Sequence, residues 1–417
     1  MFHPYSDKNK FGYYTVGNVN TYRKLEAIEI GRKTNQPVRW NFNNEVFSSV
    51  DWSKEPEANL LELYRRRAQQ IRDSYDYVVV MLSGGADSTA MLKSFLDNGI
   101  YPDEILSAHE LNGAKDPNWY LTGEVINSAI PWVQKYLDTG IPTRYRVVDT
   151  SEWQYNALNN LTVGARDDSY YNFNNVHNLG MLGRFRFREN IEDYRKIIDS
   201  GRRLCLVWGE QKPRISYDRK RQCHKFSFRE ASLDAYVGPI YQEVDQPGYF
   251  DELFFSSPNM PEIVIKQAYE CLKYLRNPEL FPDIIKDQST FPRIINNQTP
   301  GLGLTPNAVE FKVWHPWHSS VETVKKIQSF CLTKDGLHSI IYPHIEPITY
   351  DQLKGPRSVV YPRDGWLVNA NPEAAKKWFQ GYYSNVVGLR LEQHPTTQAL
   401  DVMGGEWYLG NDYHLPF

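Results

Sequence analysis

The sequence feature that most constrains the fold is the stretch 78–92, which reads VVVMLSGGADSTAML. It begins with an apolar, largely β-branched run without polar alternation, which is typical of a strand buried on both faces of a parallel sheet. A short polar loop with two glycines follows, and a helical pattern follows the loop. A strand, a tight turn and a helix start in direct succession predict an α/β fold with this segment at its centre.

The polar loop of this stretch has the composition of an anion site. Gly84 and Gly85 let the backbone turn sharply and let a ligand approach without a Cβ in the way. The N–H groups of the loop and of the first helical turn point at one place, where the positive end of the helix dipole attracts phosphate. Ser83 and Ser88 add hydroxyl donors, and Asp87 in such a site indicates a cation such as Mg²⁺ on a polyphosphate.

Helical and strand patterns alternate along the chain after the loop. Further strands are expected at 104–109, 143–148 and 204–208, and helices at 87–98, 119–137, 153–161 and 180–199. This alternation predicts a Rossmann-like α/β fold, a parallel sheet with helices on both faces. Ligands of such sheets bind outside the carboxyl ends of the strands, where the strand order reverses.

The remaining patterns divide the chain into three regions. Residues 1–58 are expected to form a small N-terminal α/β addition, and residues 59–230 the α/β domain that contains the polar loop. Residues 231–417 are expected to form a mostly helical region that shapes the site of a second substrate, the acceptor. Within the outer regions we expect a hairpin over 13–22, a helix over 24–34, a strand over 38–42, and helices over 261–275, 321–332 and 372–382. A helix over 59–74 leads into the first strand of the sheet.

Composition and charge argue against several classes of protein. The formal net charge of −3 gives no overall signal for nucleic acid or a membrane surface. No apolar run approaches 18 residues, so no membrane span is expected. The N-terminal residues lack an apolar signal core, and the four cysteines form no C-x-x-C pair. A reducing, cytoplasmic setting is therefore expected.

One segment, residues 184–229, is strongly basic. It holds 14 lysines and arginines against 6 acidic residues. An excess of this size attracts phosphates or nucleic acid. A triphosphate and an anionic substrate would explain part of it, and a solvated surface the rest, so a nucleic-acid partner remains the lesser of the two alternatives.

The string SGGADS after a buried strand resembles the PP-loop of the N-type ATP pyrophosphatases. That superfamily includes the synthetase domain of asparagine synthetase and the phosphoadenylyl-sulfate reductases. The resemblance covers roughly residues 76–215 and is specific for the superfamily only. It implies a fold of the adenine nucleotide alpha hydrolase type, ATP and Mg²⁺ as cofactors, and cleavage of ATP between its α- and β-phosphates.

The resemblance also implies roles for the loop residues. Ser83, Gly84, Gly85, Asp87 and Ser88 would form the cradle for the pyrophosphate part of ATP. Asp87 would in addition act in catalysis by holding Mg²⁺.

Residues at the ends of the neighbouring strands would complete the site. Ala108 and His109 would lie near the nucleotide base, although a structural histidine at a strand end is an equal alternative. Gly209 opens the stretch Gly-Glu-Gln-Lys-Pro-Arg after the fourth strand. Glu210 would share Mg²⁺ with the loop aspartate.

Two basic residues of the same stretch complete the predicted site. Lys212 and Arg214 would act in catalysis by stabilising the departing pyrophosphate. The alternative for this stretch is a solvent-exposed loop between a strand and a helix.

Three functions follow from these patterns. The first is an enzyme that forms AMP and pyrophosphate to activate a small-molecule or nucleotide acceptor for attack by an amine, ammonia or a sulfur nucleophile. The second is a sulfonucleotide reductase or sulfur-transfer relative, which an essential Cys205 or Cys223 would favour. The third is an ATP-binding sensor without turnover. The sequence leaves the acceptor, the nucleophile and the oligomeric state open.

Overall fold

The computed structural model describes residues 7–22, 24–109, 125–159, 187–209, 214–218, 221, 223–229, 247–275, 309–312 and 403–410. Its strands are β1 (Tyr13–Val16), β2 (Val19–Thr21), β3 (Val38–Asn41), β4 (Tyr77–Met81), β5 (Glu104–His109), β6 (Arg144–Asp149), β7 (Leu204–Trp208), β8 (Arg214–Asp218), β9 (Cys223–Arg229), β10 (Tyr249–Leu253), β11 (Val309–Lys312) and β12 (Met403–Tyr408). Its helices are η1 (Asp7–Phe11), α1 (Lys24–Thr34), α2 (Asn44–Ser49), α3 (Leu60–Ser74), α4 (Ala86–Leu96), the π-helical turn η2 (Val125–Ala129), α7 (Ile130–Leu137), α8 (Ser151–Asn159), α9 (Phe187–Asn190), α10 (Glu192–Asp199) and α12 (Glu262–Leu275).

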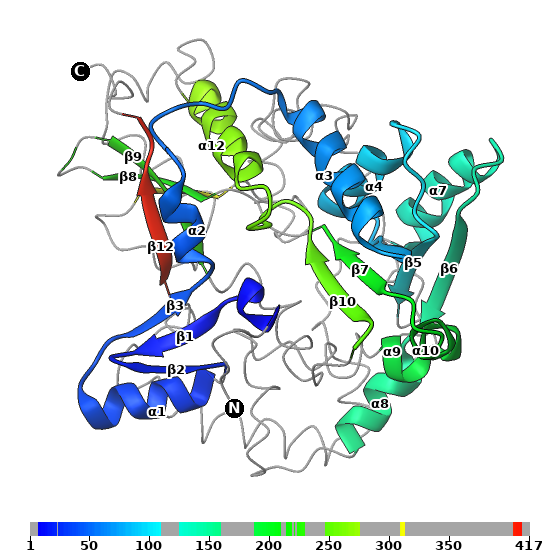
Figure 1. Ribbon diagram of the computed structural model, residues 1–417, viewed down its shortest axis with the longest axis horizontal. Helices are drawn as coiled ribbons and strands as arrows, with labels where there is room; N and C mark the ends of the chain where they lie inside the picture. The colour runs from blue at the N-terminus through cyan, green and yellow to red at the C-terminus, as the bar shows by residue number, and fades with distance from the viewer. Residues whose placement is uncertain are drawn as a thin grey trace.

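A five-stranded parallel sheet organises the described part of the chain (Figure 1). The strands lie in the order β6-β5-β4-β7-β10, and every neighbouring pair is parallel. The sheet therefore has the Rossmann-like α/β arrangement that the alternating pattern predicts. Its central strands β4 and β7 are almost wholly buried, which agrees with their unbroken apolar runs.

Helices lie on both faces of this sheet. Because β5 and β7 lie on opposite sides of β4, right-handed crossovers place α4 and the helices before β7 on opposite faces. The α3 and α4 helices pack against each other on one face. On the other face, Tyr194 of α10 donates a hydrogen bond to the buried Glu104 of β5 at 2.9 Å.

Several predicted elements are confirmed residue for residue, including the strands 104–109 and 204–208 and the helix 24–34. The single long helix expected over 180–199 is wrong. Residues 187–199 form two helices, α9 and α10, separated at Ile191, whose backbone is extended at φ −104° and ψ 105°. The Ile191 side chain is buried there, so packing against the core outweighs helical continuity.

The N-terminal residues contain the hairpin, helix and strand that the sequence predicts. A hairpin joins β1 and β2 through Gly17, which adopts φ +57°, and β3 pairs with β1 to give the order β2-β1-β3. Aromatic side chains join this unit to a second antiparallel sheet. The Trp52 ring stacks on Phe226 and Trp407 with centroids 5.0 and 5.2 Å away, and Phe47 packs on Phe228 at 4.7 Å.

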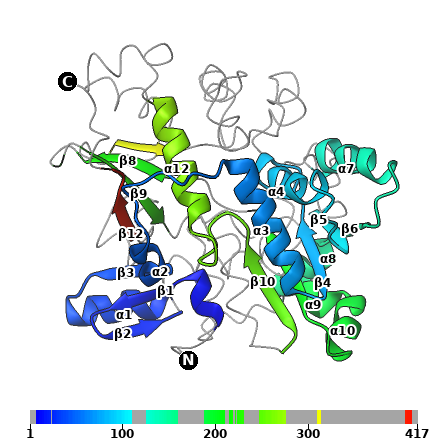
Figure 2. The same cartoon turned by 45° about the horizontal axis from the view of Figure 1, so that its top comes forward.

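The second antiparallel sheet has the order β11-β8-β9-β12, which the sequence patterns did not predict. Its strands β11 and β12 belong to the region 231–417, which was expected to be mostly helical, and α12 matches the helix expected over 261–275. The expected helices over 321–332 and 372–382 lie outside the described residues. The α12 helix lies between α3 of the parallel-sheet domain and the sheet β11-β8-β9-β12, and it contacts α3 and β8 (Figure 2).

One strand of the parallel sheet, β10, also follows residue 230, where the predicted nucleotide-binding domain ends. It is an edge strand beside β7, and it aligns Glu252 with Val207. No helix among the described residues combines the length and the apolar character that crossing a membrane requires.

Candidate functional site

The glycine loop follows the central strand β4 at the point where the strand order of the sheet reverses. From β4 the chain continues to β5 and β6 on one side, and it later returns to β7 on the other side. Crevices that bind ligands in open α/β sheets form at the carboxyl ends of two such strands. The loop predicted from SGGADS therefore lies where this fold most often binds a ligand.

The backbone of the loop requires its first glycine. Gly84 adopts φ +87°, a left-handed conformation that a side chain disfavours. Gly85 is the N-cap of α4 and brings no side-chain acceptor to the first turn. The first N–H groups of a helix have no partner within the helix, so this end of α4 presents donors and the positive end of the helix dipole.

The two loop serines hydrogen-bond to the loop itself in this structure. The hydroxyl oxygens of Ser83 and Ser88 lie 3.0 Å apart, and Ser83 N donates to the Ser88 hydroxyl at 3.2 Å. The Ser88 hydroxyl donates to Gly85 O at 3.1 Å. Both serines were predicted to be ligand donors, and here they also hold the loop in its turn.

Two further serines fix the loop from outside, and sequence reasoning did not assign them this role. The buried Ser107 of β5 donates its hydroxyl hydrogen to Leu82 O at 2.7 Å. The Ser128 hydroxyl of η2 donates to Gly84 O at 2.9 Å. Ser107 follows the predicted strand pattern and could have been found there, whereas nothing in the local sequence marks Ser128.

Gly209 closes the opposite side of the loop. It follows β7, and a Cβ placed on it would lie 2.9 Å from Ser88 Cα and 3.0 Å from Asp87 O. Real Cβ atoms essentially never come that close to a backbone atom. The end of β7 can therefore approach the start of α4 this closely only with glycine at this position.

Ala108 and His109 lie at the carboxyl end of β5, as predicted. Leu106 aligns with Met81, so β5 extends three residues beyond the end of β4, alongside the loop. Both side chains are buried, and the carbonyl of His109 accepts hydrogen bonds from the N–H and hydroxyl of Thr150.

Asp87 lies in the first turn of α4 and is half-buried. Of its predicted partners, Glu210 and Lys212 lie outside the described residues. Arg214 begins β8, with its backbone aligned to Ser227 of β9, and its side chain is not among those described. The described part of the chain contains no group of three or more histidine, cysteine or acidic side chains that could hold a metal ion.

A buried acid–indole pair adjoins the loop and was missed by sequence reasoning. Trp208, the residue before Gly209, donates its indole N–H to Asp251 Oδ1 of β10 at 2.6 Å. Burial raises the pKa of Asp251 to about 6, although the hydrogen bond from Trp208 and the positive charges of Lys10 and Arg188 act in the opposite direction. This pair fixes the end of β7 against its neighbouring strand.

The chain was compared with profiles of protein families, with curated proteins and with solved structures, and none of them matches.

Proposed function

We propose that the chain binds ATP at the loop formed by Ser83–Ser88 and cleaves it to AMP and pyrophosphate, thereby activating an acceptor, as in the PP-loop superfamily that SGGADS resembles. The observation that carries this proposal is the position of the loop. A left-handed Gly84, an uncapped helix start and the close approach of Gly209 meet at the reversal point of a parallel sheet.

The loop residues favour binding of a polyphosphate. The first turn of α4 donates backbone N–H groups to the β- and γ-phosphates, and Ser83 and Ser88 exchange their mutual hydrogen bond for bonds to phosphate oxygens. Asp87 lies in the same turn and would hold Mg²⁺, which neutralises charge on the phosphates as pyrophosphate leaves. Lys212 and Arg214 would add positive charge at that point.

The proposed reaction requires no oxidant or reductant. An acceptor oxygen attacks the α-phosphorus, the bond to the bridging oxygen breaks, and pyrophosphate leaves with the electron pair. A nitrogen or sulfur nucleophile then attacks the adenylated acceptor and releases AMP. The loop acts by positioning the phosphates and by stabilising the charge that develops on the leaving group.

One observation favours adenylation over the sulfur-transfer alternative. Cys205 is the second residue of β7, is fully buried, and has a thiol pKa that burial raises well above its ordinary value. A thiol in that state is a poor nucleophile. Cys223, at the start of β9, is also buried. The ATP sensor remains the alternative from a different class.

The test is an incubation with Mg²⁺ and ATP labelled at the α- and γ-phosphates, with and without a metabolite extract. The wild-type chain should form AMP and pyrophosphate. Asp87→Asn should lower the rate at least about a hundredfold, as loss of a transition-state charge interaction does. Asp97→Asn is the matched control, because Asp97 follows the other end of α4 and pairs with Lys93 there.

Each outcome has a distinct meaning. Formation of ADP and phosphate would show that the loop does not direct cleavage between the α- and β-phosphates. Tight ATP binding without cleavage in any extract would favour the sensor. Equal loss of activity in the Asp87 and Asp97 variants would assign the effect to the stability of α4.

A further inference from the structure

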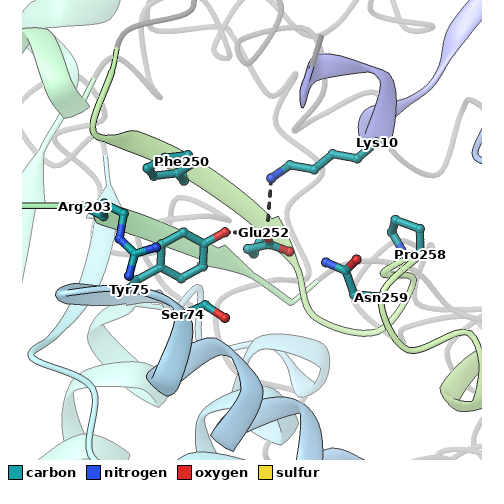
Figure 3. Close-up of a pocket in the computed structure, with 8 residues that line it drawn as sticks. All are labelled: Lys10, Ser74, Tyr75, Arg203, Phe250, Glu252, Pro258 and Asn259. Carbon is teal, nitrogen blue, oxygen red and sulfur yellow. Dashed lines mark hydrogen bonds and ion pairs between the residues drawn. The ribbon is translucent and has the colours of Figure 1, made fainter. Parts of the chain in front are cut away.

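A cavity lies beside the edge strand β10, which β7 separates from β4 and its glycine loop. It encloses about 420 Å³ and is lined by residues of η1, the end of α3, the start of β7, and β10 with the turn after it (Figure 3). Tyr75 and Arg203 precede β4 and β7 and so lie at the amino ends of these strands, whereas the glycine loop follows the carboxyl end of β4. The cavity also reaches Glu252 near the carboxyl end of β10, so it runs along the edge strand of the sheet, whereas the glycine loop follows the central strand β4.

The floor of the cavity is the buried carboxylate of Glu252, 6% of whose side chain is exposed. Tyr75 donates its hydroxyl hydrogen to Glu252 Oε1 at 2.6 Å, and Arg67 donates to Oε2 at 2.7 Å. Burial would raise the pKa of this carboxyl, but the charges of Arg67 and Lys10 outweigh that effect and hold it at about 2. Glu252 is therefore ionised, and Arg67 beneath the cavity already balances its charge.

Lys10 adds a positive charge that is not required to neutralise Glu252, because Arg67 already does so. It reaches over from η1, and its ammonium lies 3.2 Å from Glu252 Oε1, which is its one hydrogen-bond acceptor among the described residues. An ammonium has three N–H donors, so two N–H groups of Lys10 remain to donate to a ligand. Arg203 lines the cavity as well and contacts only the half-exposed Asp76 at 3.5 Å among described carboxylates. The lining is thus net positive.

The rest of the lining combines aromatic rings with an amide. The Tyr75 and Phe250 rings lie 5.3 Å apart at 45° and form an apolar wall. The side-chain amide of Asn259 has no hydrogen-bond partner among the described residues. In Figure 3, Lys10 and Asn259 lie on one side of Glu252, and Phe250 and Tyr75 lie on the other. A ligand with a charged end and a flat apolar body matches this division.

We propose that this cavity binds a small aromatic carboxylate, with the carboxylate at Lys10 and Asn259 and the ring against Phe250 and Tyr75. The cavity volume falls in the range of small-molecule sites. Arg67 and Lys10 together offset the repulsion between Glu252 and the incoming anion, and the aromatic wall buries the apolar part of the ligand. The site is independent of ATP and of the proposed reaction.

The test uses 2-naphthoate and its neutral isostere 2-naphthamide, titrated into the full chain and followed by calorimetry and ligand fluorescence. The wild type should bind naphthoate at least about tenfold more tightly than naphthamide, since a hydrogen bond between charged groups is worth that much. Saturating ATP should not displace naphthoate. Displacement by ATP would mean that the anion binds at the glycine loop, and it would overturn the proposal.

Variants separate a ligand site from a purely structural ion-pair network. Lys10→Met keeps an unbranched side chain, one atom shorter, and removes the charge; it should weaken naphthoate binding about tenfold while leaving naphthamide binding unchanged. Lys54→Met is the matched control, because Lys54 is exposed and pairs only with Asp51 at 3.4 Å among the described residues. Thermal unfolding of both variants shows whether they are folded.

Three results would overturn the proposal. They are equal affinity for naphthoate and naphthamide, naphthoate binding that a folded Lys10→Met variant retains in full, and no binding of either compound at millimolar concentration. In each case the charges around Glu252 would serve the packing of β10 against α3 and nothing more.

Discussion

The glycine loop and the cavity beside β10 both present positive potential, but they are built from different parts of the chain. The loop uses backbone: Gly84 in a left-handed conformation, and the first turn of α4. The cavity uses side chains from segments far apart in sequence, with Lys10 and Glu252 separated by 242 residues. A backbone site depends on the absence of side chains, whereas a side-chain site depends on their charges.

This difference determines how each site can be broken. Adding a single methyl group at Gly209 should destroy the loop, because the new carbon would press against backbone atoms of Asp87 and Ser88. Backbone atoms cannot move aside independently of the chain. Removing the Glu252 charge should destabilise the cavity, because the buried Arg67 then loses its partner. The predictions below apply one kind of change to each site, in order of decreasing effect.

The largest effect is expected from Gly209→Ala. The new Cβ would lie 2.9 to 3.1 Å from backbone atoms of Asp87 and Ser88, so the start of α4 must shift. If the loop is the site of the proposed ATP cleavage, a shift of this kind costs on the order of a hundredfold in rate. We therefore expect AMP formation to fall at least about that far, measured with labelled ATP.

Gly99→Ala is the control for this prediction. Gly99 follows the other end of α4 and adopts φ +68°, and a Cβ placed on it would meet no neighbouring described residue within 4 Å. Its substitution should cost about 1 kcal/mol of stability through backbone strain and leave ATP cleavage unchanged. Similar activity loss in both variants would mean that Gly209 acts through the stability of α4 and not through the shape of the loop.

At the cavity, Glu252→Gln should have the next largest effect. It leaves Arg67 and Lys10 beside a neutral amide, and breaking a buried pair in this way costs about 3 to 5 kcal/mol. Because the pKa of Glu252 falls from an ordinary 4.5 to about 2 in the folded chain, its contribution is complete above pH 4.5 and is lost as the pH falls toward 2. Urea unfolding at pH 7 and pH 3 measures both effects.

Glu62→Gln gives a matched comparison. The pKa of Glu62 is also about 2, because Arg65 and Arg66 donate hydrogen bonds to it, but its side chain lies on the surface of α3 and is 34% exposed. Solvent screens such pairs, so this substitution should change the unfolding free energy little. Equal destabilisation by Glu252→Gln and Glu62→Gln would show that burial does not make the ion pairs of Glu252 contribute more to stability than those of Glu62.

The same difference explains which site the sequence could predict. The loop is local: strand, glycines and helix start are adjacent in the sequence. The resulting prediction of a tight turn between a strand and a helix agrees with the structure at Gly84 and α4. Gly209 was also singled out, because it opens the polar stretch that follows the strand predicted over 204–208. Its contact with Ser88, however, depends on β7 lying beside β4, which the order of elements in the chain does not fix.

The cavity could not be predicted, because its parts meet only through tertiary pairing. β10 reads Tyr-Phe-Asp-Glu-Leu, and two adjacent acids do not suggest a buried strand. The acids are tolerated because each faces its own set of partners: Trp208 donates to Asp251, and Arg67 and Tyr75 donate to Glu252. Likewise, the expected helix over 180–199 did not anticipate the extended Ile191, whose burial is a tertiary effect.

Apart from the control variants, the smallest effect is expected from Asp251→Asn, which also links the two regions. Asp251 directly precedes Glu252 on β10 but points to the other face, because successive side chains of a strand alternate. There it accepts the indole N–H of Trp208, the residue before Gly209. An asparagine oxygen can accept the same hydrogen bond without a buried charge.

The pH dependence of this variant has the opposite sign to that of Glu252. Burial raises the pKa of Asp251 from an ordinary 3.8 to about 6, so the folded chain holds this proton more tightly than the unfolded chain does. Wild-type stability from this group is complete below pH 3.8 and is lost as the pH rises through 6. Asp251→Asn should therefore gain about 2 to 3 kcal/mol over wild type at pH 8 and nothing at pH 3.5, measured by urea unfolding. A gain that does not change with pH would show that burying the charge of Asp251 costs no stability. A loss of AMP formation at unchanged stability would show that the Asp251 carboxylate, through Trp208, holds the end of β7 against the glycine loop.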